Sequence, residues 1–378
     1  MSFKIIPDDS PILRNPAFYN VYPIHNETSC NNFAINDLLT VSSNVRCIDD
    51  SYGRLFDASG NYLRFVYGVS KEMPLYQEIQ GLDIVDTLRV PYRKIPVYAA
   101  NSKQDIKQAI VDISRKNPSY KVLIRGQTKT YYIDRPAQEK QILFGDSDAK
   151  EPSFLPSHLR QSFDPKFLQC MWQNQGDILL NDLRHDCKHL LSVEQFREFS
   201  QDAMRISRTT YHMPFSLGIA QHYGMPSVGL DLTDSVSVAS WFATKSIRTS
   251  NEGLASISDI EFENGFEPII FIFRCPRDAV FDYQLLKPRH SPEGRPDRQN
   301  AWFGHVGWGE AKNQLGSYLC CAFRLTKKYI ESNLNVNNEY YFPSRDQDPI
   351  LDYFFKMRGM EKYEGEAKRA LSGVYFIA

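Results

Sequence analysis

Two short apolar runs that end in polar motifs constrain what this chain can fold into. Residues 123–127 read Leu-Ile-Arg-Gly-Gln, so an apolar run stops abruptly at Arg125. Residues 227–232 form a second strand-like run, and Thr233 and a helical pattern over 235–246 follow it directly. Short apolar runs bounded by Gly and polar residues are typical of buried strands. Both runs therefore predict strands that carry polar side chains to the edge of a β core.

Helix-like and strand-like segments follow one another without a regular repeat. Apolar residues at helical spacing over 102–116 predict a helix, and the strand 120–124 follows it. Further helices are predicted over 177–190 and 192–208, and further strands over 269–273 and 317–325. This order predicts an α+β fold in which helices flank a central mixed β core.

Length and composition limit the classes of protein to consider. The chain has 378 residues, enough for two domains, and its formal charge is −1. Near-neutrality argues against a protein held on nucleic acid by its overall charge, although a local basic patch remains open. We expect no membrane segment, no signal peptide and reduced thiols, hence a cytoplasmic location, because the seven Cys show no paired spacing. Residues 1–95 are expected to form a β-rich accessory region and residues 356–378 a C-terminal tail.

The first polar motif has the residue types that bind a phosphate. The Arg125 guanidinium can pair with a phosphate or carboxylate through two parallel hydrogen bonds. Gly126 lets a ligand approach the backbone closely, and the Gln127 amide can both donate and accept. The alternative is structural, with Arg125 paired to Asp231 to hold two strands together.

The second polar motif, Gln-His-Tyr-Gly-Met-Pro over 221–226, offers other chemistry. His222 could transfer a proton or bond a ribose hydroxyl, and Tyr223 could stack on a flat ring. Alternatively, the motif is a turn in which His222 bonds a carbonyl and Tyr223 belongs to the core. Asp231 and Thr233 stand where a helix begins, so both could be ordinary helix caps. We favour Asp231 as a residue that orients Arg125 or His222.

A third polar segment precedes a late aromatic pair. Gln299 follows a basic stretch over 287–298, which we expect at the surface, where it could meet an anionic partner. Gln314 is the alternative to Gln299 as the polar residue of this third segment. His185 and His189 have the spacing of zinc ligands on one helix face, but no second pair of ligands follows at suitable spacing, so no metal site is predicted.

These motifs together resemble the FRG domain. The family pattern runs aromatic-Arg-Gly-Gln, Leu-x-Pro-Ser-x-x-Arg, Gln-His-Tyr-Gly-x-Pro, Leu-Asp-x-Thr and Ala-x-x-Phe-Ala. The corresponding residues here lie at 124–127, 155–160, 221–226, 230–233 and 239–243. Ile124 replaces the usual aromatic residue, and Ser227-Val228-Gly229 replaces a turn that often contains Arg. The resemblance covers residues 96–355 when its weaker C-terminal part is included.

The layout of the motifs is also similar, less specifically, to that of ADP-ribosyltransferases, which implies a split sheet and an enzyme acting on NAD or a related nucleotide. Under this resemblance Arg125 holds the phosphates with Gly126 and Gln127, and Tyr223 stacks on the base. Gln299 positions the acceptor, and His222, Asp231 and Thr233 complete the site. The implied setting is a bacterial toxin or antiphage defence effector with a protein or RNA acceptor. Two alternatives stay open: a non-catalytic module that senses a nucleotide or nucleic acid, and an RNA-directed nuclease that uses His222 with Arg125.

Overall fold

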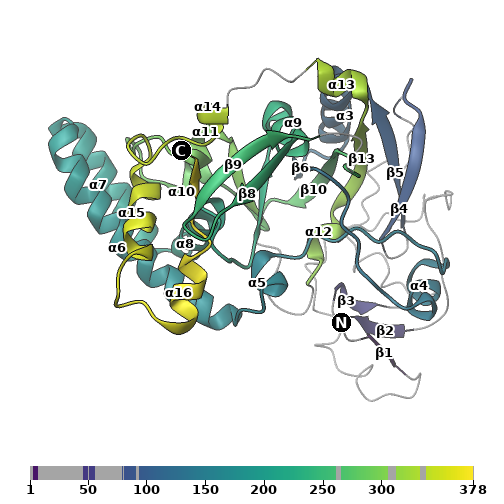
Figure 1. Cartoon of the computed structure of the whole chain (residues 1–378), viewed down its shortest axis with the longest axis horizontal. Coiled ribbons are helices and arrows are strands. Elements are labelled where there is room, and N and C mark those ends of the chain that lie inside the picture. The colour runs from purple at the N-terminus through teal and green to yellow at the C-terminus, as the bar shows by residue number, and fades with distance from the viewer. Residues whose placement is uncertain are drawn as a thin grey trace. The chain divides into compact units, whose positions relative to one another are not determined.

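The fold of the chain is mixed α+β, as the sequence predicts. A computed structural model describes residues 3–6, 46–49, 51–55, 79, 81–90, 93–260, 265–304, 312–332 and 338–377 (Figure 1). Residues 7–45 and 56–78 of the expected β-rich accessory region lie outside these residues. Contacts divide the chain into two compact units, each built from separate stretches of sequence. The first unit comprises Met1–Leu155, Gly265–Arg277 and Val306–Ser332, and the second comprises Pro156–Asn264, Asp278–His305 and Asn333–Ala378.

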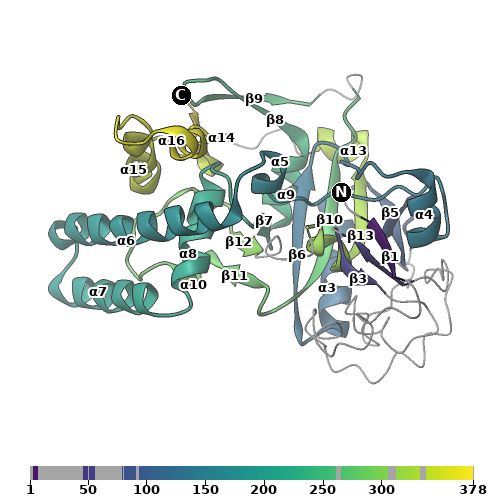
Figure 2. The same ribbon diagram turned by 90° about the horizontal axis from the view of Figure 1, so that it is seen from below.

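The first unit is built on five neighbouring strands of a mixed sheet. Their order is β6 (Tyr120–Gln127), β10 (Ile269–Pro276), β13 (Leu319–Leu325), β5 (Arg93–Ala100) and β4 (Ile84–Val90). β13 and β5 run parallel, and the other neighbouring pairs are antiparallel (Figure 2). All eight residues of β10 are buried, as expected for a continuous apolar run in a central strand. The predicted strands at 120–124, 269–273 and 317–325 are confirmed.

Helix α3 (Lys103–Lys116) connects β5 to β6 and confirms the predicted helix. Its start is fixed by a capping box of Ser102 and Asp105, in which the Asp105 carboxylate accepts a hydrogen bond from the Ser102 N–H. Ile106 and Ala109 are buried. The smaller helices of this unit are α4 (Ala137–Phe144), α12 (Gln314–Ser317) and α13 (Lys327–Glu331).

A three-stranded antiparallel sheet at the N-terminus also belongs to the first unit. Its strands are β1 (Phe3–Ile6), β2 (Arg46–Asp49) and β3 (Gly53–Leu55). Asp49 at the end of β2 bonds the fully buried guanidinium of Arg135, which also bonds Glu151. One buried cation thus joins the N-terminal sheet to a segment about 100 residues away in the sequence.

The second unit contains the longest helices. α6 (Pro165–Leu190) and α7 (Val193–Arg208) form a helical hairpin, and α8 (His212–His222) packs against α6 (Figure 1). α7 confirms the helix predicted over 192–208, and its first turn contains a capping box formed by Ser192 and Gln195. α6 begins twelve residues before the predicted start, because Asp164 caps it and Pro165 occupies its first turn.

Short strands complete the second unit. β11 (Val280–Asp282), β12 (Ala301–Gly304) and β7 (Leu230–Thr233) are antiparallel neighbours, and β7 leads into α9 (Val236–Thr244). β8 (Lys245–Thr249) and β9 (Leu254–Asp259) form a hairpin (Figure 2). β14 (Phe376–Ile377) pairs with β9 in parallel. The remaining helices are α5 (Ser157–Arg160), α10 (Tyr283–Leu286), α11 (Arg295–Arg298), α14 (Asn338–Tyr341), α15 (Pro349–Arg358) and α16 (Gly365–Leu371). Across the described ranges, no helix has both the length and the apolar character needed to cross a membrane.

Candidate functional site

The second unit brings the Gln-His-Tyr-Gly motif against Asp231. Gln221 and His222 are the last two residues of α8, and Asp231 lies in β7. The Gln221 Nε2 donates to the Asp231 Oδ2 over 3.3 Å, and the His222 Nδ1 lies 2.9 Å from the Asp231 Oδ1. The His222 contact has the distance of an ion pair without the alignment of a hydrogen bond. Each oxygen of the carboxylate therefore has its own polar neighbour.

The Leu-Pro-Ser motif adds further polar contacts to Gln221. Ser157 begins α5, and its hydroxyl lies 3.2 Å from the Gln221 Oε1. The Ser157 Oγ also accepts a 2.9 Å hydrogen bond from the Ser227 N–H, while the His158 Nδ1 contacts the Ser227 carbonyl at 3.1 Å. Three separate family motifs thus meet in one polar network.

The members of this network differ in solvent exposure. The Asp231 side chain is 37% exposed, whereas the His222 side chain is 1% exposed. The His222 ring packs edge-on against Tyr283, with ring centroids 5.7 Å apart. Asp231 is therefore the more exposed member of the pair. The predicted role of Asp231 in orienting Arg125 or His222 stays a prediction.

Tyr223 does not present a face to a ligand. Its side chain is 0% exposed, and its hydroxyl donates to the Asp348 carboxylate at 2.8 Å. Burial, together with the Asp348 charge, holds the pKa of Tyr223 well above its usual value. The predicted stacking role disagrees with this placement, because the aromatic body of Tyr223 belongs to the core.

A different aromatic residue lies beside the motif. Tyr375, from the C-terminal segment, is partly exposed and packs directly on Gly224. Gly224 has φ +90°, and a Cβ there would lie 2.5 Å from the Gly373 carbonyl and 2.7 Å from the Tyr375 ring. Only glycine fits this position. Burial raises the pKa of Tyr375, and the Asp231 charge raises it further, so the two side chains are within electrostatic reach.

Thr233 and Gln299 meet each other, in a buried structural contact. The Thr233 hydroxyl donates to the Gln299 carbonyl at 3.0 Å, and the Gln299 amide donates to the Tyr341 carbonyl at 3.0 Å. Both residues are buried. Their bonds fix the start of β12 beside β7, so neither side chain is placed to touch a ligand. Gln314, the alternative, bonds Tyr318 in the first unit.

The Arg-Gly-Gln motif lies in the first unit. Arg125, Gly126 and Gln127 are the last three residues of β6 and all three are partly buried, whereas Leu123 and Ile124 are buried. Arg125 pairs in register with Phe271 of β10. Because Arg125 and Asp231 belong to different units, the expectation that they share one pocket stays a prediction.

The basic segment 287–298 lies only partly at the surface, where we expected it, with Arg289 and His290 exposed. Arg295 is fully buried, with its guanidinium stacked over three aromatic rings and bonded to the His222 and Tyr375 carbonyls. Arg289 bonds Asp202 of α7 at 2.7 Å, and Lys287 pairs with Asp297. Acidic neighbours thus pair with Arg289 and Lys287, and the predicted role of the segment in binding an anionic partner stays a prediction.

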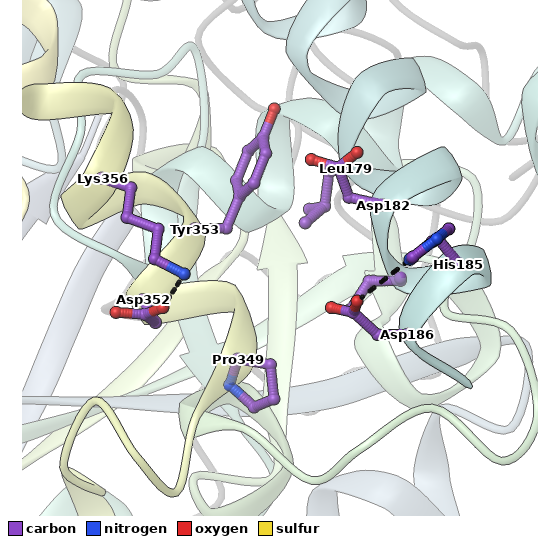
Figure 3. Close-up of a pocket in the computed structure, with 9 residues that line it drawn as sticks. Leu179, Asp182, His185, Asp186, Pro349, Asp352, Tyr353 and Lys356 are labelled. Carbon is purple, nitrogen blue, oxygen red and sulfur yellow. Dashed lines mark ion pairs between the residues drawn. The ribbon is translucent and has the colours of Figure 1, made fainter. Parts of the chain in front are cut away.

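A pocket of about 300 Å³ lies elsewhere in the second unit, between α6 and α15 (Figure 3). Asp182 and Asp186 come from α6, and Asp352 and Lys356, which form an ion pair at 2.7 Å, come from α15. None of the predicted site residues lines it. Within the described residues, no three His, Cys, Asp or Glu side chains are grouped as metal ligands would be, and the His185 and His189 rings lie 6.0 Å apart on α6.

Sequence reasoning missed three residues of the site. Ser157 and Gln221 belong to recognised motifs, and their polar side chains beside apolar or aromatic neighbours were the available signal. Tyr375 had no such signal, because its contact with Gly224 joins residues about 150 positions apart.

A comparison with protein families finds a match over part of the chain. Residues 159–252 match the model of the FRG domain. The match supports the FRG family, and it includes Gln221, His222 and Asp231, whereas Arg125 and Gln299 lie outside it. No curated protein and no solved structure shows a significant match to the chain.

Proposed function

We propose that this chain is an FRG-domain enzyme that acts on NAD or a related nucleotide. The supporting observation is the Asp231 carboxylate, which is partly exposed and has His222 at one oxygen and Gln221 at the other. Cleavage of the nicotinamide–ribose bond leaves positive charge on the sugar, and a fixed carboxylate stabilises such charge. The same carboxylate can accept hydrogen bonds from ribose hydroxyls.

In this proposal the polar group at the reacting sugar is Asp231, and not Gln299, which the sequence predicted to position the acceptor. The change removes a chemical difficulty, because an amide cannot act as a base or carry the negative charge that a cationic sugar requires. Tyr375 replaces Tyr223 as the candidate for contact with a flat ring. Arg125, with Gly126 and Gln127, remains the candidate for the phosphates, since a guanidinium matches phosphate geometry.

The reaction we propose is transfer of the ADP-ribosyl group of NAD to a nucleophile. The glycosidic bond to nicotinamide breaks, nicotinamide leaves with the bonding electron pair, and the nucleophile forms the new bond while losing its proton. The proposed acceptor is a protein or an RNA, and the proposed setting is a bacterial toxin or an antiphage defence effector. The FRG match and the arrangement of the motifs motivate this part of the proposal.

Incubating the purified full chain with NAD and measuring released nicotinamide tests the proposal. Asp231→Asn should lower the release at least tenfold, because it removes the negative charge at the sugar and keeps the shape. Asp234→Asn is the matched control, since Asp234 lies three residues away, is exposed and bonds Trp302. We expect this control to retain wild-type release.

The same assay separates the two alternatives. NAD that binds to the wild-type chain without turnover would favour a sensing module over an enzyme. Cleavage of RNA together with no release of nicotinamide would favour the nuclease. Equal release by wild type and Asp231→Asn would remove Asp231 from the chemistry.

A further inference from the structure

The pocket between α6 and α15 combines apolar, aromatic and charged lining residues (Figure 3). Leu179 and Leu183 of α6 line it together with Pro349 of α15. Its volume of about 300 Å³ is at the lower end of the range for pockets that hold small organic ligands. Apolar lining residues favour a ligand with a carbon skeleton over a bare ion, because they gain from removing apolar surface from water.

Tyr353 supplies the aromatic part of the lining. Its hydroxyl donates a 3.3 Å hydrogen bond to the Gln175 Oε1, which holds the ring in place. Burial raises the pKa of Tyr353, and the charge of Asp182 raises it further, so the phenol is neutral and lies within electrostatic reach of this carboxylate. An aromatic ring beside a carboxylate suits an organic cation, because both groups attract positive charge.

Two carboxylates lie one helical turn apart on the α6 side of the pocket, those of Asp182 and Asp186. Across the described part of the chain, Asp182 forms no hydrogen bond and no ion pair. Asp186 has the exposed ring of its neighbour His185 at 3.6 Å. Like charges four residues apart on a helix repel each other, so a cation bound beside them would relieve this repulsion.

The α15 side of the pocket is electrically compensated. Asp352 pairs with both Lys356 and Arg345, each at 2.7 Å. Lys356 is also within electrostatic reach of Asp186, so Asp182 is the carboxylate of the pocket with the least compensation. Figure 3 shows the two sides facing each other, with Asp182 and Asp186 across from Asp352 and Lys356. This difference between the sides favours a ligand whose positive group lies next to α6.

We propose that this pocket binds a small organic cation, an ammonium or guanidinium group carried on a flat or apolar body. The positive group donates hydrogen bonds to Asp182 and lies near Asp186, and the body packs against Tyr353 and the leucines of α6. None of these residues belongs to the Gln-His-Tyr-Gly site. The proposal therefore goes beyond the proposed function and does not depend on it.

Titrating the full chain with three phenyl compounds tests the charge of the ligand. Phenethylamine carries an ammonium group, phenethyl alcohol carries a hydroxyl in its place, and hydrocinnamate carries a carboxylate. By isothermal titration calorimetry at low salt, we expect the amine to bind at least about tenfold more tightly than the alcohol, and the carboxylate to bind more weakly than either. Equal affinities of the amine and the alcohol, or no saturable binding of the amine, would overturn the proposal.

Asp182→Asn assigns the binding to this pocket. It should lower the affinity for phenethylamine at least about tenfold and leave that for phenethyl alcohol unchanged, because it removes one charge and keeps the shape. Asp182 is exposed, so the melting temperature should stay close to that of wild type.

Glu194→Gln is the matched control for this variant. It also removes one negative charge from an exposed position, on α7 and outside the pocket. We expect it to keep the wild-type affinity for the amine. Equal losses in Glu194→Gln and Asp182→Asn would show that the amine responds to the overall charge of the chain, which would overturn the pocket as its site.

Tyr353 provides a second variant that does not change the charge. Tyr353→Phe keeps the ring and should retain the affinity for phenethylamine, whereas Tyr353→Leu removes the ring and should lower the affinity about threefold or more. Undiminished binding of the amine by Tyr353→Leu would contradict the contact with the ring.

Discussion

At the scale of single residues, one buried cation in the first unit pairs with two buried carboxylates and lies 3.5 Å from a third, that of the partly exposed Glu139. The Arg135 guanidinium bonds Asp49 and Glu151, and all three side chains are fully buried. Burial raises the pKa of Glu151 to about 7, and the Asp49 charge adds to the rise, against the opposing effect of Arg135. Because one positive charge cannot neutralise two negative ones, binding of a proton by Glu151 stabilises the folded state.

This pKa predicts how stability depends on pH. The pKa of Glu151 is higher in the folded state than in the unfolded chain, where a Glu has a pKa of about 4.3. The folded state therefore holds this proton more tightly. The stabilisation is therefore fully present below the unfolded pKa and is lost as the pH rises to about 7, with a slope of at most about 1.4 kcal/mol per pH unit. Urea unfolding between pH 4.5 and 7.5 measures it. Glu151→Gln should flatten this part of the profile, and an unchanged slope in that variant would assign the pH dependence to other groups.

At the scale of elements, the sequence predicted the features that depend on residues close together in the chain. The predicted starts of α3 and α7 agree with the structure to within one residue, and the capping boxes at Ser102 and Ser192 involve residues only three positions apart. α8 was missed, since it is buried on nearly all sides and lacks the alternation of polar and apolar faces that reveals a helix. The placement of Tyr223 depends on Asp348, 125 residues later, which no local pattern encodes.

Asp348 joins several elements of the second unit. Its buried carboxylate caps α15 through the N–H groups of Ile350 and Leu351, and it also accepts from the Tyr223 hydroxyl and the Arg295 N–H. Asp348→Ala should lower the free energy of unfolding by about 3 kcal/mol or more, because buried donors lose their acceptor.

Asp164 offers a matched control for this prediction. It also caps a helix, α6, but it is exposed and bonds the Lys166 N–H. Asp164→Ala should cost about 1 kcal/mol, the usual cost of losing a helix cap. Equal losses in the two variants, measured by urea unfolding, would show that Asp348 acts as an ordinary cap.

At the scale of the whole molecule, the sequence predicted the mixed α+β class, but not how the chain is divided. Each unit is assembled from three stretches of sequence. The contiguous boundaries expected near residues 95 and 355 stay a prediction, and the structure shows β5 running through residue 95 and α15 through residue 355. Local patterns cannot reveal such a division, because it depends on which distant segments pack together.

This division predicts that the stretch matching the FRG model, residues 159–252, does not fold alone. The fragment lacks β12, so β7 loses its antiparallel neighbour, and it lacks Asp348, so the Tyr223 hydroxyl would be buried without its acceptor. It also lacks Asn338, which accepts from the Trp241 indole. We expect the fragment to give poorly dispersed amide resonances and no cooperative unfolding, whereas the full chain gives both under the same conditions. A cooperative unfolding transition in the isolated fragment would mean that α6–α9 and β7 form a stable core without the later segments.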